Sequence, residues 1–405
     1  MGFSNSLETL LHKIHKSKED KNILSRLFEE NVPHVKSEDW KYAPLRHFSQ
    51  LVLSEANKGN PDISSYLKKG ELSLIFYNGK LIHFPAELPS GMTLERQEPS
   101  SQQKKQKQFF ASINANLQKE VWTLSIEKNI SIDKPVKIYH ILEGEPSKNS
   151  WASTSFQIKI GANSQASFRE YFISQNIHSC FYNYSEYIHL HPFSKISYLS
   201  KQNMNLNSYL MHLTHMVLQK GSEGFSYVQS TGAHYSRHTL DVLLTERNAT
   251  MKSLGTYALH HDQQCENYVQ MDHLAEETTS EQIYKGLLND QSIATFQTGV
   301  HVFPGAKLSS SKQMNRNVSL SSKSLVNAKP QLNIENDDVK CSHGVTVGQM
   351  NPDEIFYLES RGILPEKSQY MILEGFMKDL LNQLPLDKEF QKAWLYDLLL
   401  SFKER

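Results

Sequence analysis

The sequence predicts a mainly β protein whose core is a β-helix, a solenoid of short strands, with helical regions at both ends. Three observations predict this class. From about residue 121 to about residue 349, apolar alternating strands follow one another without an intervening helical pattern. The turns between them recur at intervals of about 26 to 30 residues, as in repeat architectures. Helical spacing is confined to the residues before and after this stretch.

The turn sequences indicate how the coils are built. The first four begin at Gly161, His191, Gln219 and Thr245, and each follows one apolar strand and precedes another. Later turns come at about half that interval, as expected if each coil contains two turns; they are NDQSIA at 289, PGAKL at 304, SSKSLV at 321 and ENDDV at 335. Because no long helix separates the strands, a sheet of βαβ units is excluded and the coils bury a continuous interior.

The amino-terminal region predicts short amphipathic helices. Apolar residues stand at helical spacing over 7–14 and again over 23–28, before Pro33 ends the pattern. Trp40 and Tyr42 follow, and we expect them to anchor this region on the core rather than to bind a ligand, since aromatic side chains contribute large buried areas.

A β-hairpin and a charged linker separate this region from the coils. Asn78 and Gly79 lie between alternating strands and predict a type I′ turn. The stretch Ser100–Gln108 has no apolar periodicity and predicts a linker, where we place a domain boundary. The predicted domains are a helical region with a hairpin and linker at 1–108, the β-helix at 109–350, and a helical region at 351–405.

Helical signals return after the last strand. Asn351 is a good N-cap and Pro352 suits the first helical position. Gly362 predicts the end of this helix, Pro365 opens a second, and a third follows Pro385. The third helix has one apolar stripe, which predicts either packing on the chain's own core or contact with a partner; the stripe is Phe390, Trp394, Leu395 and Leu398.

Composition excludes several classes of function. Lys plus Arg equals Asp plus Glu at 43 each, so no net charge attracts nucleic acid or an anionic membrane. No basic and apolar signal segment opens the chain, and no apolar stretch approaches the roughly 18 residues of a membrane span. We therefore expect a soluble, cytoplasmic protein that binds neither nucleic acid nor membrane.

The motifs present also limit the chemistry. The P-loop pattern GxxxxGK[ST] is absent, so any nucleotide hydrolysis must come from another protein. Only three cysteines occur, and they are widely spaced, which argues against a disulfide framework. A four-thiolate cluster site cannot be built from three scattered cysteines, so a cluster held here needs ligands from elsewhere.

Cys341 and His343 are the main candidate ligands. They alternate with polar residues after an acidic turn, as in a half-buried strand, so their side chains point the same way. A thiolate and an imidazole suit iron, zinc or copper, although two ligands do not complete a metal site. The alternative is that Cys341 is a packed core thiol and His343 is merely hydrogen-bonded.

The same stretch carries a resemblance to a known family. The segments KPQL (329–332), DDVKCSHG (337–344), TVGQ (346–349) and FYLESRGI (356–363) resemble the signature of the SufB/SufD family of the SUF iron-sulfur cluster assembly machinery. Further similar segments follow in the family's order: SEDWKYAPL at 37–45, LIFYNGKLI at 74–82, MDHLAEETTSEQIYKGLL at 271–288 and QMNRNVSLS at 313–321. SufB proteins are longer and differ at the CSHG segment, which favours the SufD branch.

The resemblance implies a right-handed parallel β-helix that acts as a scaffold and not as an enzyme. It implies pairing with a SufB-like subunit through the β-helix and docking of a SufC-like ATPase on the carboxyl-terminal helices. It also implies a transient iron-sulfur cluster shared with the partner, with His343 as a ligand and Cys341 as the weaker candidate. The candidate ATPase-docking residues are Phe356, Tyr370, Leu373, Phe376 and Met377.

Three alternatives stay open. A β-helix with acidic turns is also found in carbohydrate-active enzymes, which would require clustered acidic residues on one strand face. A purely structural scaffold would leave Cys341 inert. In isolation, the chain could pair with a second copy of itself.

A second donor-rich stretch contains His260, His261, Cys265 and His273. It lacks zinc-finger spacing, so we expect structural roles there.

Overall fold

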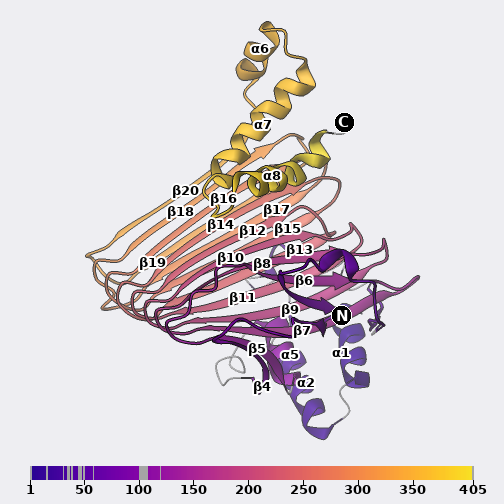
Figure 1. Ribbon diagram of the computed structural model, residues 1–405. Coiled ribbons are helices and arrows are strands. Elements are labelled where there is room, and N and C mark those ends of the chain that lie inside the picture. Colours follow the sequence, from indigo (N-terminus) through magenta and orange to yellow (C-terminus); the bar gives the residue numbers. More distant parts are fainter. Residues whose placement is uncertain are drawn as a thin grey trace.

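The structure is a parallel β-helix built from two ten-stranded sheets (Figure 1). From β5 to β20, successive strands alternate between the sheets, so each coil contributes one strand to each. This confirms the predicted fold class. The computed structural model describes residues 2–14, 17–30, 32–33, 37, 40–43, 48, 51–57, 59–99, 108–118 and 120–403.

Sheet A has the strand order β19-β17-β15-β13-β11-β9-β7-β5-β4, with β1 beside β7. Its strands are β1 (Leu53–Glu55), β4 (Met92–Gln97), β5 (Val121–Ile126), β7 (Asn149–Ile160), β9 (Cys180–Leu190), β11 (Tyr209–Leu218), β13 (Tyr235–Leu244), β15 (Gln264–His273), β17 (Ile293–Val302) and β19 (Leu325–Ile334).

Sheet B has the order β20-β18-β16-β14-β12-β10-β8-β6-β2-β3. Its strands are β2 (Leu72–Tyr77), β3 (Lys80–His83), β6 (Val136–Leu142), β8 (Gln165–Ser174), β10 (Lys195–Asn203), β12 (Glu223–Ser230), β14 (Thr250–Leu259), β16 (Thr279–Leu288), β18 (Ser310–Ser319) and β20 (Lys340–Gln349).

The recurring turns predicted from the sequence stack on one another. In every coil from β5 to β18, a residue between the sheet A strand and the next sheet B strand has positive φ and faces the following coil, as at Asn163 (57°) and Phe193 (60°). The N–H of each such residue donates to the next coil, for example from Asn163 to the Pro192 carbonyl at 3.0 Å. The left-handed conformation thus lets every turn hydrogen-bond to its neighbour, which explains the regular spacing in the sequence.

Antiparallel pairs form the amino-terminal end of the β-helix. Its outermost strands, β4 and β3, pair antiparallel with β5 and β2. Asn78 and Gly79 between β2 and β3 have φ of 45° and 83°, which confirms the predicted type I′ turn. The predicted linker lies outside the described residues except for Gln108, which precedes helix α5.

The amino-terminal helices cover the outward face of sheet A. They are α1 (Gly2–Ile14), α2 (Lys18–Glu30) and α5 (Phe109–Leu117). Leu7, Leu24 and Phe110 from these helices join one apolar cluster with Phe181 and Tyr209 of the sheet. Trp40 is buried in the same cluster, as predicted for an anchor.

The carboxyl-terminal helices begin and end as predicted. Asn351 caps α6 (Pro352–Ser360) by accepting a hydrogen bond from the Asp353 N–H at 3.0 Å, and Gly362 follows the helix with φ of 82°. Then come α7 (Pro365–Leu381) and α8 (Lys388–Lys403). In Figure 1, α6 projects away from the β-helix. No helix in the described part of the chain is long and apolar enough to cross a membrane.

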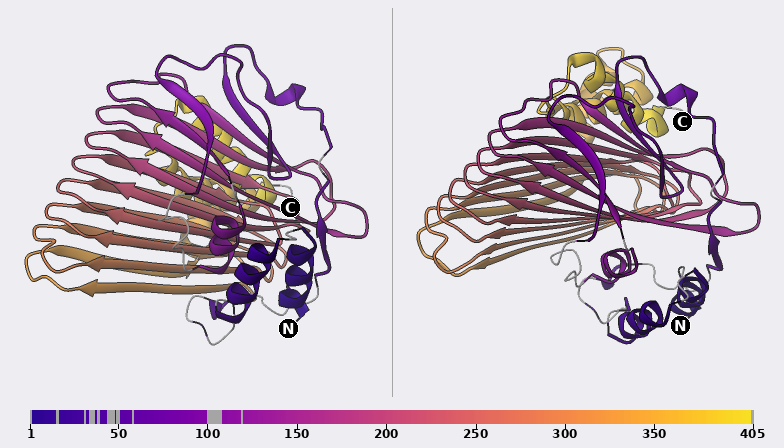
Figure 2. Two further views of the ribbon diagram at one scale, coloured as in Figure 1. Left: turned by 90° about the horizontal axis from the view of Figure 1, so that it is seen from below. Right: turned by 60° about the horizontal axis from the view of Figure 1, so that its bottom comes forward.

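Helices α7 and α8 pack on the outward face of sheet B, away from the amino-terminal helices (Figure 2). Trp394 and Leu398 of α8 are buried with Leu254 and Leu287 of the sheet. The apolar stripe of the third helix, for which the sequence left two interpretations, therefore serves mainly to pack this helix on the chain's own core.

Candidate functional site

Cys341 and His343 continue the inward face of sheet B on its last strand, β20. The strand register places Cys341 beside Ser311 and His343 beside Gln313 on β18. Ser311 and Gln313 are buried inward-facing residues. Because side chains two apart on a strand share a face, Cys341 and His343 point to the same side, as predicted.

The coil that holds these two donors is open. Among the described residues, no strand pairs with the outer edges of β19 and β20. Inward side chains are therefore accessible here: His343 is exposed, Cys341 is half-buried, and Val347 is 54% exposed. Gln313 on β18 pairs in register with His343 but belongs to the preceding coil, and it is only 1% exposed.

The open coil also carries an unsatisfied polar group. Neither Oε1 nor Nε2 of the buried Gln313 side chain has a hydrogen-bond partner among the described residues. Strands in a sheet lie about 4.8 Å apart, so this amide is next to His343. A group bound at His343 from the open side would lie within reach of the amide.

Of the two candidate ligands, the Cys341 thiol is less ready to bind a metal ion. Burial raises the pKa of Cys341, with a smaller opposing effect from a backbone hydrogen bond to Ser311. At neutral pH the thiol is therefore protonated, and metal binding would have to displace that proton. His343 is exposed. A neutral imidazole binds iron through the lone pair of its unprotonated ring nitrogen, so no proton has to be displaced.

Among the described residues, Cys341 and His343 are the two strong donors on the inward faces of β19 and β20. The inward residues of β19, which face β20 across the interior, are Val326, Ala328, Pro330, Leu332 and Ile334, judged from their register with buried β17 residues. These side chains offer no metal ligand. A metal ion or cluster bound here would need further ligands from another molecule.

The predicted docking residues differ in how far they are exposed. Leu373 and Met377 on α7 are buried against sheet B. Tyr370 and Phe376 are half-buried in the same cluster, and Phe376 lies under the Lys285 ammonium group at 4.8 Å. Phe356 on α6 is 70% exposed. Only the last is fully presented to a partner.

Other exposed apolar side chains lie on α6, on α7 and on the turn between them. Tyr357 is 58% exposed, Leu364 between α6 and α7 is 72% exposed, and Met371 is 40% exposed. These residues were not among the predicted docking residues, because an exposed apolar residue and a buried one look alike in a helical pattern. Together with Phe356 they form the α6–α7 apolar surface.

The second donor-rich stretch does not form a common site. Cys265 is the second residue of β15 and His273 is the last, which separates them by about 26 Å along the strand. His273 is buried, with its ring nitrogens 2.8 Å from the hydroxyls of Thr278 and Ser280. His261 is on an exposed turn beside Asp290. The structural roles expected for these residues agree with this placement.

One group of potential ligands was missed in the sequence. Among the described residues, Glu170, Glu186 and His212 are the three whose ligand atoms come close enough to share a metal ion, all within 4.8 Å of one another. A signal was present: Glu170 alternates with Ala166, Phe168 and Phe172, which places a carboxylate on an apolar inward face.

The sequence also matches known proteins. A family model described as "SUF system FeS cluster assembly, SufBD core domain" matches residues 143–376. An iron-sulfur cluster assembly SufBD family protein of Synechocystis is 25% identical over 383 residues, covering 88% of this chain and 84% of the relative. The iron-sulfur cluster assembly protein SufD of Escherichia coli is 25% identical over 370 residues, covering 89% and 87%. SufD of Bacillus subtilis is 28% identical over 151 residues, covering 36% and 35%.

Proposed function

The chain belongs to the SufBD family of the SUF system for iron-sulfur cluster assembly, and we propose that it acts there as a non-catalytic scaffold subunit of the SufD type. In this proposal it pairs with a SufB-like subunit and two copies of a SufC-like ATPase. The complex assembles nascent iron-sulfur clusters and supports their transfer to apoproteins in the cytoplasm.

The open carboxyl-terminal coil is the observation that carries this proposal. It combines two strand edges that can accept another chain with an exposed imidazole and a half-buried thiol on its inward face. A SufB-like β-helix that covered this coil would add the ligands that the coil lacks. The cluster would then be cargo held between two subunits, with His343 as the ligand from this chain and Cys341 as the weaker candidate.

The α6–α7 apolar surface is the proposed docking site of the ATPase. Helix α6 projects from the body and exposes Phe356 and Tyr357, while α7 is fixed to sheet B. A motor protein that moved α6 and α7 would therefore act on the β-helix through the buried side of α7, where Leu373 and Met377 lie.

A continuous path of contacts connects this helix with the open coil. The Lys285 ammonium group on β16 donates to the Asp379 carboxylate at 2.8 Å and to the Phe376 carbonyl at 2.7 Å, both on α7. Lys285 pairs in register with Arg316 on β18, and Arg316 pairs with Thr346 on β20. We infer that ATP-driven closure of the ATPase pair changes the open coil through these strands and exposes the cluster ligands.

Affinity purification of the tagged full chain from its native cell, followed by mass spectrometry, tests the proposed complex. A SufB-like subunit and a SufC-like ATPase should be recovered with it. Val347→Lys puts a charge on the open coil and should remove the SufB-like subunit while the ATPase stays bound. Val52→Lys is the matched control, because Val52 is also exposed (75%) but lies in the amino-terminal region.

Recovery of the unmodified chain as a lone monomer would contradict the proposed complex. Equal recovery of the SufB-like subunit with Val347→Lys and with Val52→Lys would contradict the placement of the subunit interface at the open coil.

A further inference from the structure

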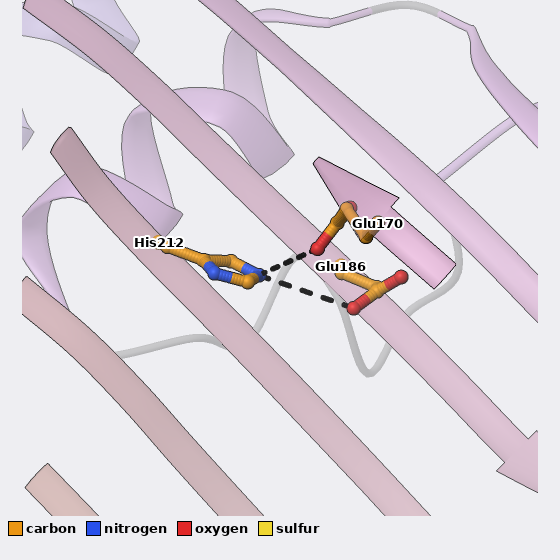
Figure 3. Close-up of side chains that lie close together, drawn as sticks. All are labelled: Glu170, Glu186 and His212. Carbon is orange, nitrogen blue, oxygen red and sulfur yellow. Dashed lines mark ion pairs between the residues drawn. The ribbon is translucent and has the colours of Figure 1, made fainter. Parts of the chain in front are cut away.

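Three ionisable side chains meet inside the central coils of the β-helix, far along the strand order from the open coil (Figure 3). Glu170 comes from β8 in sheet B, and Glu186 and His212 come from β9 and β11 in sheet A. The His212 Nε2 atom is 3.7 Å from Glu170 Oε2 and 4.0 Å from Glu186 Oε2. The two sheets therefore present their donors toward one point in the interior.

These side chains are removed from solvent and incompletely paired. Glu170 and Glu186 are 0% exposed and His212 is 3% exposed. Neither Oε2 of Glu170 nor Oε1 of Glu186 accepts a hydrogen bond of normal geometry from the described residues. The Tyr198 hydroxyl lies near enough to lower the pKa of both carboxyl groups, but it too lacks a hydrogen bond of normal geometry. Buried carboxylate oxygens in this condition are costly unless a cation or a proton compensates them.

Burial also changes the pKa values of these side chains. It lowers the pKa of His212 to about 3. Burial and the charge of Glu170 raise the pKa of Glu186 well above its usual value. Burial acts to raise the pKa of Glu170, but its hydrogen bond with His140 acts in the other direction, and the pKa is lowered from its usual value.

Neighbouring residues hold the donors in place. His140 Nε2 is 2.9 Å from Glu170 Oε1, and His140 Nδ1 is 2.9 Å from the Tyr182 hydroxyl. The Thr214 hydroxyl is 3.1 Å from His212 Nε2 and 3.5 Å from Glu186 Oε2. The His140 contact with Glu170 is of the kind that orients a ligand in a metal site, whereas an ion bound at His212 Nε2 would displace the Thr214 hydroxyl from that nitrogen.

We propose that Glu170, Glu186 and His212 form a buried site for one divalent first-row transition-metal ion. Carboxylate oxygens and one imidazole nitrogen bind such ions at about 2.0 to 2.2 Å, which places the ligand atoms about 3.4 Å apart. Small side-chain shifts would shorten the present distances between the three ligand atoms to that value. This site is separate from the proposed cluster-binding coil and requires no partner subunit.

The space next to His212 suits one further small ligand. A cavity of about 10 Å³ adjoins it, with Tyr198, Thr214 and His238 among its lining residues. Such a volume holds about one water molecule, which could complete the coordination of the ion. Because the β-helix encloses the site, the ion must enter while the chain folds.

The test loads the metal during expression. Cells producing the full chain are grown with added Co²⁺ or, separately, Zn²⁺, and the purified protein is dialysed against a chelator before its metal content is measured by mass spectrometry. About one ion per chain should remain. The Co²⁺ form should show visible d–d absorption without thiolate-to-cobalt charge transfer, because the three ligands contain no sulfur.

Glu186→Gln separates ligation from folding. An amide replaces the carboxyl group at nearly the same volume, so the metal-free variant should keep its unfolding temperature while metal retention falls at least tenfold. His212→Gln should also lose the ion and gives a second measurement if the first variant does not accumulate. His273→Gln is the matched control, because His273 is an equally buried imidazole that lies outside the site.

A double variant with Cys341→Ala and His343→Ala should keep the ion, which distinguishes this site from the open coil. Less than about a tenth of an equivalent in the unsubstituted chain, equal retention by Glu186→Gln, or a thiolate charge-transfer band would each overturn the proposal.

Discussion

The central coils and the last coil of the β-helix both place donor side chains on the inward face of sheet B but give them opposite environments. Glu170 on β8 is covered by strands on both sides and fully buried, whereas His343 on β20 has a neighbour on one side only and is exposed. The strand geometry is the same in both places. What differs is whether another coil follows.

The position of a coil along the solenoid therefore decides which groups an inward-facing donor side chain can contact. In a central coil the donor can meet only residues of its own chain, so it either joins a polar network or binds an ion enclosed during folding. In the last coil the donor can meet a second protein, and its ligand set can be completed from outside. The predictions that follow test this contrast, from the largest expected effect to the smallest.

The largest expected difference between the central coils and the last coil is in the rate of thiol alkylation. Cys180 and Cys265 are buried in the central coils, where burial raises the pKa of Cys180 to about 12 and that of Cys265 to about 11. Cys341 is only half-buried, so iodoacetamide should modify it at least about 100-fold faster than the other two, since those react only after the core opens. Peptide mass spectrometry of the folded chain measures the three rates.

The pH dependence of that reaction follows from the thiolate requirement. Because the pKa of Cys341 is raised, its alkylation rate should still be increasing between pH 7 and pH 9, by about tenfold per pH unit. Rates that are equal at the three cysteines would show that the last coil is covered as fully as the others.

Variants of the exposed α6–α7 apolar surface and of the buried side of α7 should differ nearly as much, the first in partner binding and the second in stability. Leu364→Glu and Phe356→Glu alter the exposed α6–α7 apolar surface and should weaken ATPase binding by about 30-fold, the effect of losing a strong contact residue, with little change in stability. Leu373→Ala removes a buried side chain and should cost about 2 to 5 kcal/mol of folding free energy. Titration calorimetry and urea unfolding measure the two effects.

Ile177→Glu serves as the control for the exposed variants, because Ile177 is 76% exposed on a turn outside these helices. If it weakened ATPase binding as much as Phe356→Glu does, the assignment of the docking surface to α6 and α7 would be wrong.

Two valines test the contrast in packing. Val300 on β17 is 1% exposed, while Val347 on β20 is 54% exposed. Val300→Ala should destabilise the chain by about 2 kcal/mol, from lost burial and the cavity left behind, and Val347→Ala by less than about 0.5 kcal/mol. Urea unfolding of the isolated chain measures both values, and equal losses would contradict an open last coil.

Features with a local cause were predictable from the sequence. The Asn78–Gly79 turn, the Asn351 cap and the stacked turns each depend on the backbone preferences of a few adjacent residues. The fold class followed, because a β-helix repeats one such local pattern many times. The same reasoning found Cys341 and His343 on one face of one strand.

Features that depend on contacts between distant strands were not predictable in the same way. Glu170 and His212 are 42 positions apart in the sequence and belong to different sheets. Their proximity depends on the register of several coils, which periodicity does not determine. Likewise, the apolar stripe with Trp394 could be assigned to core packing only once sheet B was known to present Leu254 and Leu287 outward.

The central claim is that the last coil contributes a ligand to the nascent cluster, and the most direct test is reconstitution with His343→Ala. The complex with the SufB-like and SufC-like partners should assemble normally, while its iron and sulfide content and its cluster transfer to an apoprotein should fall by about 10 to 100-fold. Cys341→Ala should have a milder effect, and His261→Ala, at an exposed turn, should have none. Normal iron, sulfide and transfer from an intact complex with His343→Ala would contradict the claim and leave the chain a purely architectural partner.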